Sequence, residues 1–102
     1  MNQKELITFL RNYNRTLPKG IRLTGLFGSY ARDTQDIYSD IDLTYQMDHN
    51  IFYPENAFKK LTALEEIKHE LENTLKHHID LIPENTKDPL LQESLRKEKI
   101  CI

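Results

Sequence analysis

The sequence predicts an α/β (α+β) fold: a small, mixed, twisted β-sheet of about four strands, with helices packed mainly on one face. Two observations predict it. Residues 2–15 and 56–76 carry apolar side chains at helical spacing. Four shorter segments read as strands, at residues 21–27, 40–47, 78–83 and 100–102. A length of 102 residues with 38% hydrophobic residues fits one domain, residues 1–102.

The first helix is predicted from Asn2 to about Arg15. One face of it is apolar: Leu6, Phe9, Leu10 and Tyr13. Asn2 is expected to cap this helix, with Glu5 reaching back to it. The Pro and Gly of residues 18–20 end it.

The first strand, Ile21 to Phe27, leads into a glycine turn. Gly25 permits a close approach to the strand. Gly28 turns the chain, and Ser29 to Arg32 are expected to begin a short helix. Free backbone N–H groups at such a turn suit phosphate oxygens. The same pattern also describes an ordinary serine-capped turn, so alone it does not separate the two interpretations.

The second strand, Asp40 to Met47, carries two carboxylates. Side chains alternate along a strand, so Asp40 and Asp42 point to one face while Ile41 and Leu43 point to the other. The two carboxylates repel each other, and a hard cation such as Mg²⁺ would remove that cost. The alternative is an edge strand with a solvated face.

The third strand, His78 to Pro83, repeats this parity. Ile79 and Leu81 are expected to face the core, whereas His78, Asp80 and Ile82 face away. An aspartate between Ile79 and Leu81 on such a strand needs a reason to be there, and a surface position on an edge is the plain one.

Two more helices are predicted around this strand, the first after a loop at residues 48–55. Its apolar stripe is Ala57, Leu61, Leu64, Ile67 or Lys68, Leu71 and Leu75. The last helix begins at the Asp88-Pro89 pair, with Leu90, Leu91 and Leu95 on its apolar side.

Composition excludes several classes of protein. A net charge of −2 gives no sign of direct nucleic-acid binding. One cysteine, Cys101, excludes an internal disulfide and a cysteine-based metal cluster, which fits a reducing cytoplasm. No signal peptide is recognisable, and no apolar run approaches the roughly 18 residues of a membrane span. The adjacent His77 and His78 point apart on a strand, which argues against zinc.

Two motifs resemble a known family. Gly28-Ser29-Tyr30-Ala31-Arg32 and Ser39-Asp40-Ile41-Asp42-Leu43 are similar to the signature of minimal nucleotidyltransferases, within the superfamily of DNA polymerase β. The resemblance covers most of the chain, including the strand with Asp80. Asp33 departs from the pattern, because the family usually has glycine there.

The resemblance implies a role for each of these residues. Asp40, Asp42 and Asp80 would be catalytic and would hold Mg²⁺, two ions in all. Gly28 and Ser29 would grip the phosphates of ATP. Arg32 would neutralise triphosphate charge, unless it forms a salt bridge to Asp33 or Asp36. The sequence leaves open whether Tyr30 lines the nucleotide pocket or packs, and whether His78 borders the site.

The resemblance also implies a partner. Such proteins transfer a nucleoside monophosphate, here AMP from ATP, to a hydroxyl, and they act as antitoxins that adenylylate a tyrosine on a HEPN-domain toxin. The acceptor site is expected from that partner or from a second copy of the chain. Two alternatives stay open: an antitoxin that neutralises its partner by contact alone, and a homodimeric enzyme acting on a small molecule.

Overall fold

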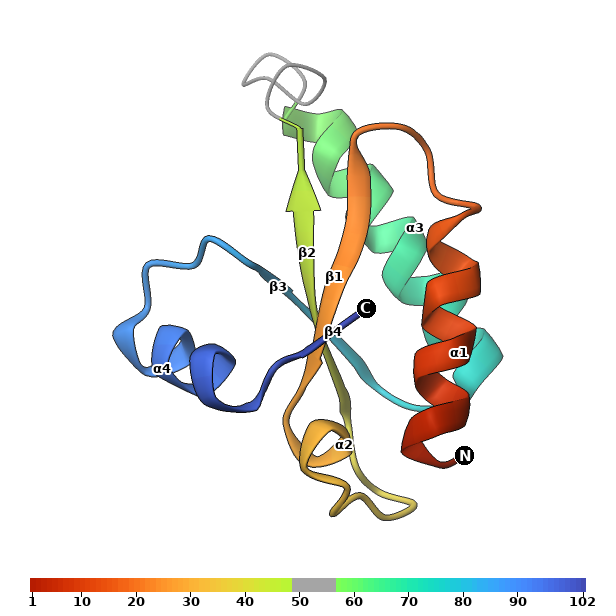
Figure 1. Ribbon diagram of the computed structural model, residues 1–102. Helices are drawn as coiled ribbons and strands as arrows, with labels where there is room; N and C mark the ends of the chain where they lie inside the picture. Colours follow the sequence, from red (N-terminus) through yellow and green to blue (C-terminus); the bar gives the residue numbers. More distant parts are fainter. Residues whose placement is uncertain (49–56) are drawn as a thin grey trace.

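The computed structural model describes residues 1–48 and 57–102, with side chains described from residue 61 onward in the second part. Its elements, in order, are α1 (Gln3–Asn14), β1 (Ile21–Phe27), α2 (Ser29–Arg32), β2 (Ile41–Met47), α3 (Ala57–Leu75), β3 (Ile79–Pro83), α4 (Pro89–Glu98) and β4 (Ile100–Cys101) (Figure 1). The sequence predicted each of them to within one residue at the described ends. The loop predicted beyond Asp48 and the predicted helix start at Asn56 lie outside the described residues.

The four strands form one mixed sheet in the order β3-β2-β1-β4. Strand β1 is antiparallel to both of its neighbours, β2 and β4, whereas β2 and β3 are parallel. A parallel pair needs a crossover connection, and the long helix α3 lies in it. The predicted mixed sheet is therefore confirmed.

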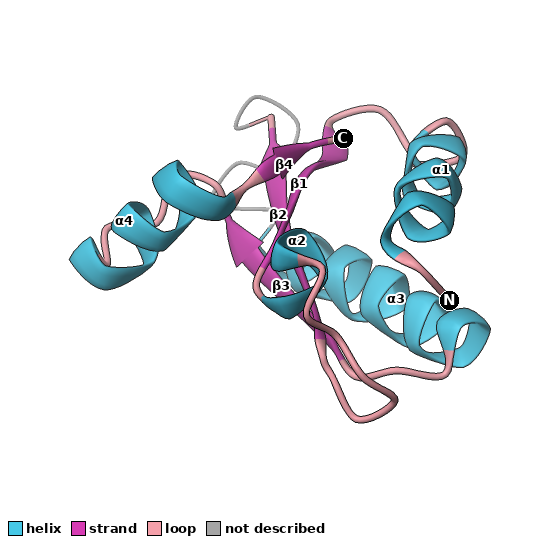
Figure 2. Cartoon of the chain, turned by 60° about the horizontal axis from the view of Figure 1, so that its bottom comes forward, coloured by secondary structure: helices cyan, strands magenta, loops and turns pink. Residues whose placement is uncertain are grey.

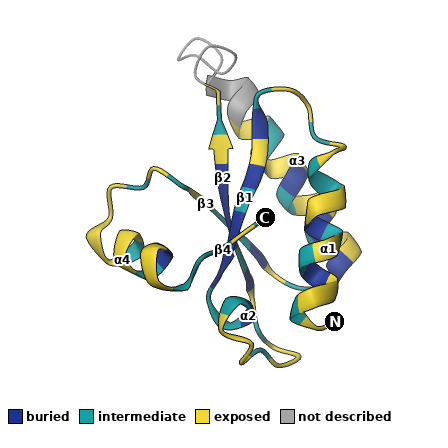
Figure 3. Ribbon diagram, in the orientation of Figure 1, coloured by how far each residue is buried: buried dark blue, intermediate teal, exposed yellow. Residues whose placement is uncertain are grey.

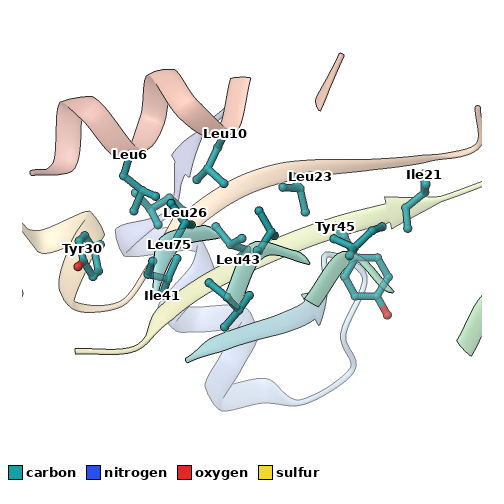
Figure 4. Packing of buried hydrophobic residues seen from close by; sticks show 13 residues of the cluster. Leu6, Leu10, Ile21, Leu23, Leu26, Tyr30, Ile41, Leu43, Tyr45 and Leu75 are labelled. Carbon is teal, nitrogen blue, oxygen red and sulfur yellow. The ribbon is translucent and has the colours of Figure 1, made fainter. Parts of the chain in front are cut away.

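Helices α1 and α3 cover one face of the sheet, and α4 lies on the other side (Figures 1 and 2). The core fills the layer between the sheet and helices α1 and α3 (Figures 3 and 4). Its members with no exposed surface are Leu6, Leu10, Leu23, Leu26, Ile41, Leu43, Leu71 and Ile79. This burial fixes which face of β2 and β3 is left for polar side chains.

Two leucines predicted to be buried are exposed. Leu61 on α3 is 62% exposed and Leu90 on α4 is 78% exposed. Periodicity identifies the apolar side of a helix, but it does not tell how far along the helix the neighbouring layer extends. The core takes up the later turns of α3, from Ile67 onward. On α4, which lies on the other side of the sheet, the buried residue is Leu95, in the later part of the helix.

The predicted helix caps are present. The side chain of Asn2 accepts a hydrogen bond from the Glu5 backbone N–H at 2.8 Å, and it donates to the Glu5 carboxylate at 2.9 Å. The side chain of Asp88 accepts from the backbone N–H of Leu90 at 3.0 Å. Each cap satisfies a backbone donor that has no partner within its helix.

Lys99 connects α4 to the sheet. A Cβ on Gly25 would lie 2.5 Å from the Lys99 Cγ and Cδ, so glycine leaves room for the lysine stem. The Lys99 ammonium pairs with Glu84, and this hydrogen bond lowers the pKa of the Glu84 carboxyl. The helices that the structure describes are all too short or too polar to cross a bilayer.

Candidate active site

The structure brings the three predicted carboxylates to one face of the sheet. Asp42 and Asp80 are register partners in the parallel β2–β3 pair. The neighbouring pair, Ile41 and Ile79, is completely buried on the opposite face. Asp40 directly precedes β2 and shares the side of Asp42, so the predicted parity is correct.

His78 lies between the carboxylates. Its Nδ1 atom is 3.6 Å from Asp40 Oδ2 and 3.7 Å from Asp80 Oδ1. One ligand atom from each of these three residues lies within 4.8 Å of the other two. Sequence reasoning placed His78 on the face of Asp80 without a role. Its position two residues before Asp80 on the same strand was the signal that could have added it to the site.

Asp42 lies against the glycine turn. Phe27, the last residue of β1, pairs with Asp42, and Gly28 follows at once with φ of 77°. A Cβ at Gly28 would overlap Asp42 Oδ2. Glycine is required here both by its backbone conformation and by this contact. The turn and the carboxylates are thus parts of one site.

The carboxylates are crowded. Burial, contact with Asp80 and the charge of Asp40 together raise the pKa of Asp42 to about 6, although His78 acts in the opposite direction. Among the residues whose side chains are described, no Lys or Arg pairs with any of the three carboxylates. A cluster of acids without a paired cation suits a bound divalent metal ion, and carboxylate oxygens are the ligands that Mg²⁺ prefers. The donor set therefore fits the metal that the resemblance implied.

Arg32 points toward the C-terminal helix. Its Nη1 atom donates to Glu98 Oε2 on α4 at 2.8 Å, and the side chains are 49% and 30% exposed. The alternative prediction, that Arg32 forms a salt bridge to Asp33 or Asp36, is wrong. Arg32 does form a salt bridge, but its partner is Glu98. Glu98 is 66 residues away in sequence, so no local pattern indicates this pair.

Two open questions around the turn are settled by geometry. Tyr30 is 1% exposed and packs with the core (Figure 4), so it does not line an open pocket. Asp33 ends α2 in the left-handed conformation, with φ of 58° and ψ of 38°. Glycine adopts this conformation at little cost, and aspartate is among the few other residues that tolerate it. The loop accommodates the departure from the family pattern by keeping a glycine-like backbone.

The carboxylates lie on an open surface. A cavity of about 660 Å³ is found at the far end of β2, lined by Arg22, Tyr45, Gln46, Met47 and Glu84 among others. A second cavity of about 380 Å³ lies beside α4. None of the three aspartates lines either cavity. The carboxylates are therefore reached from the exposed face of the sheet rather than from a cavity.

Comparison with known proteins shows the family of the chain. The family described as "Polymerase beta, Nucleotidyltransferase" matches residues 4–102. A relative from Methanocaldococcus jannaschii, named "putative protein adenylyltransferase MJ0435", is 32% identical over 86 residues, which are 84% of each chain.

Solved structures share the fold. One described as a minimal nucleotidyltransferase superposes with a TM-score of 0.74 at 23% identity, over 100% of this chain and 97% of that one. A toxin–antitoxin crystal structure with AMP-PNP gives 0.62 at 28% identity, over 99% and 72%. The chain belongs to the polymerase β nucleotidyltransferase family, and it is a nucleotidyltransferase.

Proposed function

We propose that this protein is a Mg²⁺-dependent adenylyltransferase that transfers AMP from ATP to a tyrosine hydroxyl of a HEPN-type toxin and so acts as its antitoxin. The observation that carries the proposal is the convergence of Asp40, Asp42 and Asp80 beside Gly28 on an open face. The relative named as a protein adenylyltransferase and the toxin–antitoxin neighbour with AMP-PNP, an ATP analogue, support the substrate and the partner.

The reaction assigns a task to each group. The acceptor oxygen attacks the α-phosphorus of ATP, the bond to the bridging oxygen breaks, and pyrophosphate leaves. Asp80 accepts the proton of the acceptor hydroxyl. Asp40, Asp42 and Asp80 would hold two Mg²⁺ ions, which supply charge stabilisation for the attacking and leaving oxygens.

The glycine turn holds the other end of the nucleotide. The backbone N–H groups after Gly28 and the hydroxyl of Ser29 bind phosphate oxygens. Arg32 contributes positive charge once it leaves Glu98, which holds it at 2.8 Å in this structure. Nucleotide binding therefore competes with a contact between α2 and α4.

Intact-mass spectrometry tests the proposal. The partner is a small helical HEPN-type protein, sought in the coding region beside the gene of this chain. We expect an AMP adduct on it when this protein, ATP and Mg²⁺ are present, and loss of the adduct in Asp40→Asn. Glu65→Gln is the matched control, because it also removes one carboxylate charge but lies exposed on α3. Absence of any adduct with the wild-type protein would overturn the proposal.

The same experiment separates the alternatives. If the partner is neutralised without an adduct, and equally by Asp40→Asn, the protein is an antitoxin that acts by contact. If ATP is consumed with a low-molecular-weight alcohol and no partner is needed, the protein is a small-molecule enzyme, and its oligomeric state then becomes the next measurement.

A further inference from the structure

A half-buried histidine, His77, connects the three segments that carry the site. His77 lies between the end of α3 and the start of β3. Its Nδ1 atom is 3.1 Å from the backbone oxygen of Ser39, and its Nε2 atom is 3.4 Å from the hydroxyl of Tyr30. The rings of His77 and Tyr30 also meet edge to face, with centroids 5.9 Å apart.

The chemistry of the partners fixes the direction of these hydrogen bonds. A carbonyl oxygen only accepts, so Nδ1 of His77 must carry a proton and donate to Ser39. In the neutral imidazole Nε2 is then an acceptor, and the hydroxyl of Tyr30 donates to it. Because Tyr30 is 1% exposed, this bond also gives its hydroxyl a partner in the core.

Each end of this connection adjoins a part of the site. Tyr30 follows Gly28 and Ser29 directly in the chain. Ser39 directly precedes Asp40. His77 itself is followed by His78 and, after Ile79, by Asp80. A second hydrogen bond joins the start of β2 to the residue before β3: the Ile41 backbone N–H donates to the His78 carbonyl at 2.9 Å.

We propose that His77 is a positioning residue: it holds the Ser39 carbonyl and the Tyr30 hydroxyl so that Asp40 and the glycine turn keep their places relative to Asp80. The inference rests on the proposed function for its catalytic consequence. Its structural consequence, a fixed entry of the chain into β2, is measurable without any partner or nucleotide.

Four variants test the inference. His77→Phe keeps a ring and removes both nitrogens. His77→Asn restores a donor where Nδ1 stands, because an asparagine amide nitrogen occupies about that place. Tyr30→Phe removes only the hydroxyl. His69→Phe, at an exposed position on α3, is the control for introducing a phenylalanine.

Mn²⁺ affinity by calorimetry and hydrogen exchange of the Ile41 amide, which donates to the His78 carbonyl, are the primary readouts, and AMP transfer is the third. We expect His77→Phe to weaken Mn²⁺ binding by about 10-fold and to lower the transfer rate by 10- to 100-fold, on the order seen for groups that orient metal ligands. Exchange at Ile41 should accelerate, while exchange at Gly25 in β1 stays unchanged.

Recovery in the asparagine variant distinguishes positioning from packing. His77→Asn should regain Mn²⁺ binding and slow exchange although it fills less space, and Tyr30→Phe should show a smaller defect than His77→Phe. The inference is overturned if His77→Phe exchanges and binds Mn²⁺ like wild type, or if His77→Asn is as impaired as His77→Phe. If wild type transfers no AMP, the proposed function fails, whereas the exchange measurement still decides the role of His77.

Discussion

Asp42 of β2 and Asp80 of β3 lie directly opposite each other in the parallel register, and the proximity of Asp80 adds to burial in raising the pKa of Asp42. Such a pair is costly when both groups are ionised, because like charges at this distance repel in a partly buried site. Asp42 therefore retains its proton to higher pH than an exposed aspartate does, because its pKa is raised. A divalent cation bound there would relieve the same repulsion and would compete with that proton.

Metal-free stability should fall as pH rises, and Asp42→Asn should remove part of that fall. The pKa of Asp42 is raised from 3.8 to about 6 in the folded protein. A raised pKa contributes stability that is fully present below the unfolded value and is lost as pH rises through the folded value. Urea denaturation in EDTA should show wild type and Asp42→Asn alike near pH 4, with the variant more stable above pH 6.

Added Mg²⁺ provides the control for that measurement. It should stabilise wild type above pH 6 and do so far less for Asp42→Asn. A stability difference between the two proteins that is the same at every pH would contradict the role given to the Asp42–Asp80 pair.

Gly28→Ala should destabilise the protein by about 3 kcal/mol, from a left-handed backbone and a clash with a carboxylate. The clash depends on Asp42, whose Oδ2 occupies the space of the new Cβ. A double-mutant cycle with Asp42→Ala should therefore recover about 1–2 kcal/mol relative to the sum of the single changes. Strict additivity in urea denaturation would show that the two residues do not touch in solution.

Asp33→Gly should stabilise the protein by about 0.5–1 kcal/mol, because glycine adopts the left-handed end of α2 with less strain. Lys76→Gly is a matched control, since Lys76 also has φ of 58° after a helix. Both variants should raise the melting temperature. Only Asp33→Gly, which lies beside the site, is expected to alter AMP transfer.

Glu98→Gln should tighten ATP binding, because it frees Arg32 from the ion pair that holds it on α4. An exposed pair is worth about 0.5–1 kcal/mol, which corresponds to roughly a two- to fivefold change in affinity. Glu93→Gln is the control, since it removes the pair with Lys97 on the same helix at 3.0 Å. Unchanged ATP affinity in both Glu98→Gln and Arg32→Ala would remove Arg32 from the nucleotide site.

The sequence was most informative about the carboxylates, because side chains along a strand point alternately to its two faces. Alternation placed Asp40 and Asp42 on one face of β2 and turned Asp80 away from the core on β3, because side-chain direction in a strand is a local property. The family resemblance joined Asp80 to the other two. Backbone constraints were similarly readable: Gly28 was predicted at a turn, and the structure gives it a left-handed backbone.

Contacts between residues far apart in the sequence could not be predicted in the same way. The Arg32–Glu98 contact joins elements that meet only through the tertiary fold, and the sequence suggested nearer partners. Burial along α3 failed at Leu61 for the same reason, since the extent of the sheet beneath a helix is set by distant residues. The sequence indicated only that His77 is a poor zinc ligand. In the structure its ring contacts both the Tyr30 hydroxyl and the Ser39 carbonyl, from two other segments of the chain.

The position of β4 has a consequence for how the molecule is made. Strand β1 is flanked by β2 on one side and by residues 100–101 on the other, through the pairs Gly25–Cys101 and Leu26–Ile100. During synthesis, Ile100 of β4 is added 73 residues after Phe27, the last residue of β1. During that interval one border of the nascent sheet has unsatisfied backbone donors and acceptors, a ready template for strand addition by a chaperone or a neighbouring chain.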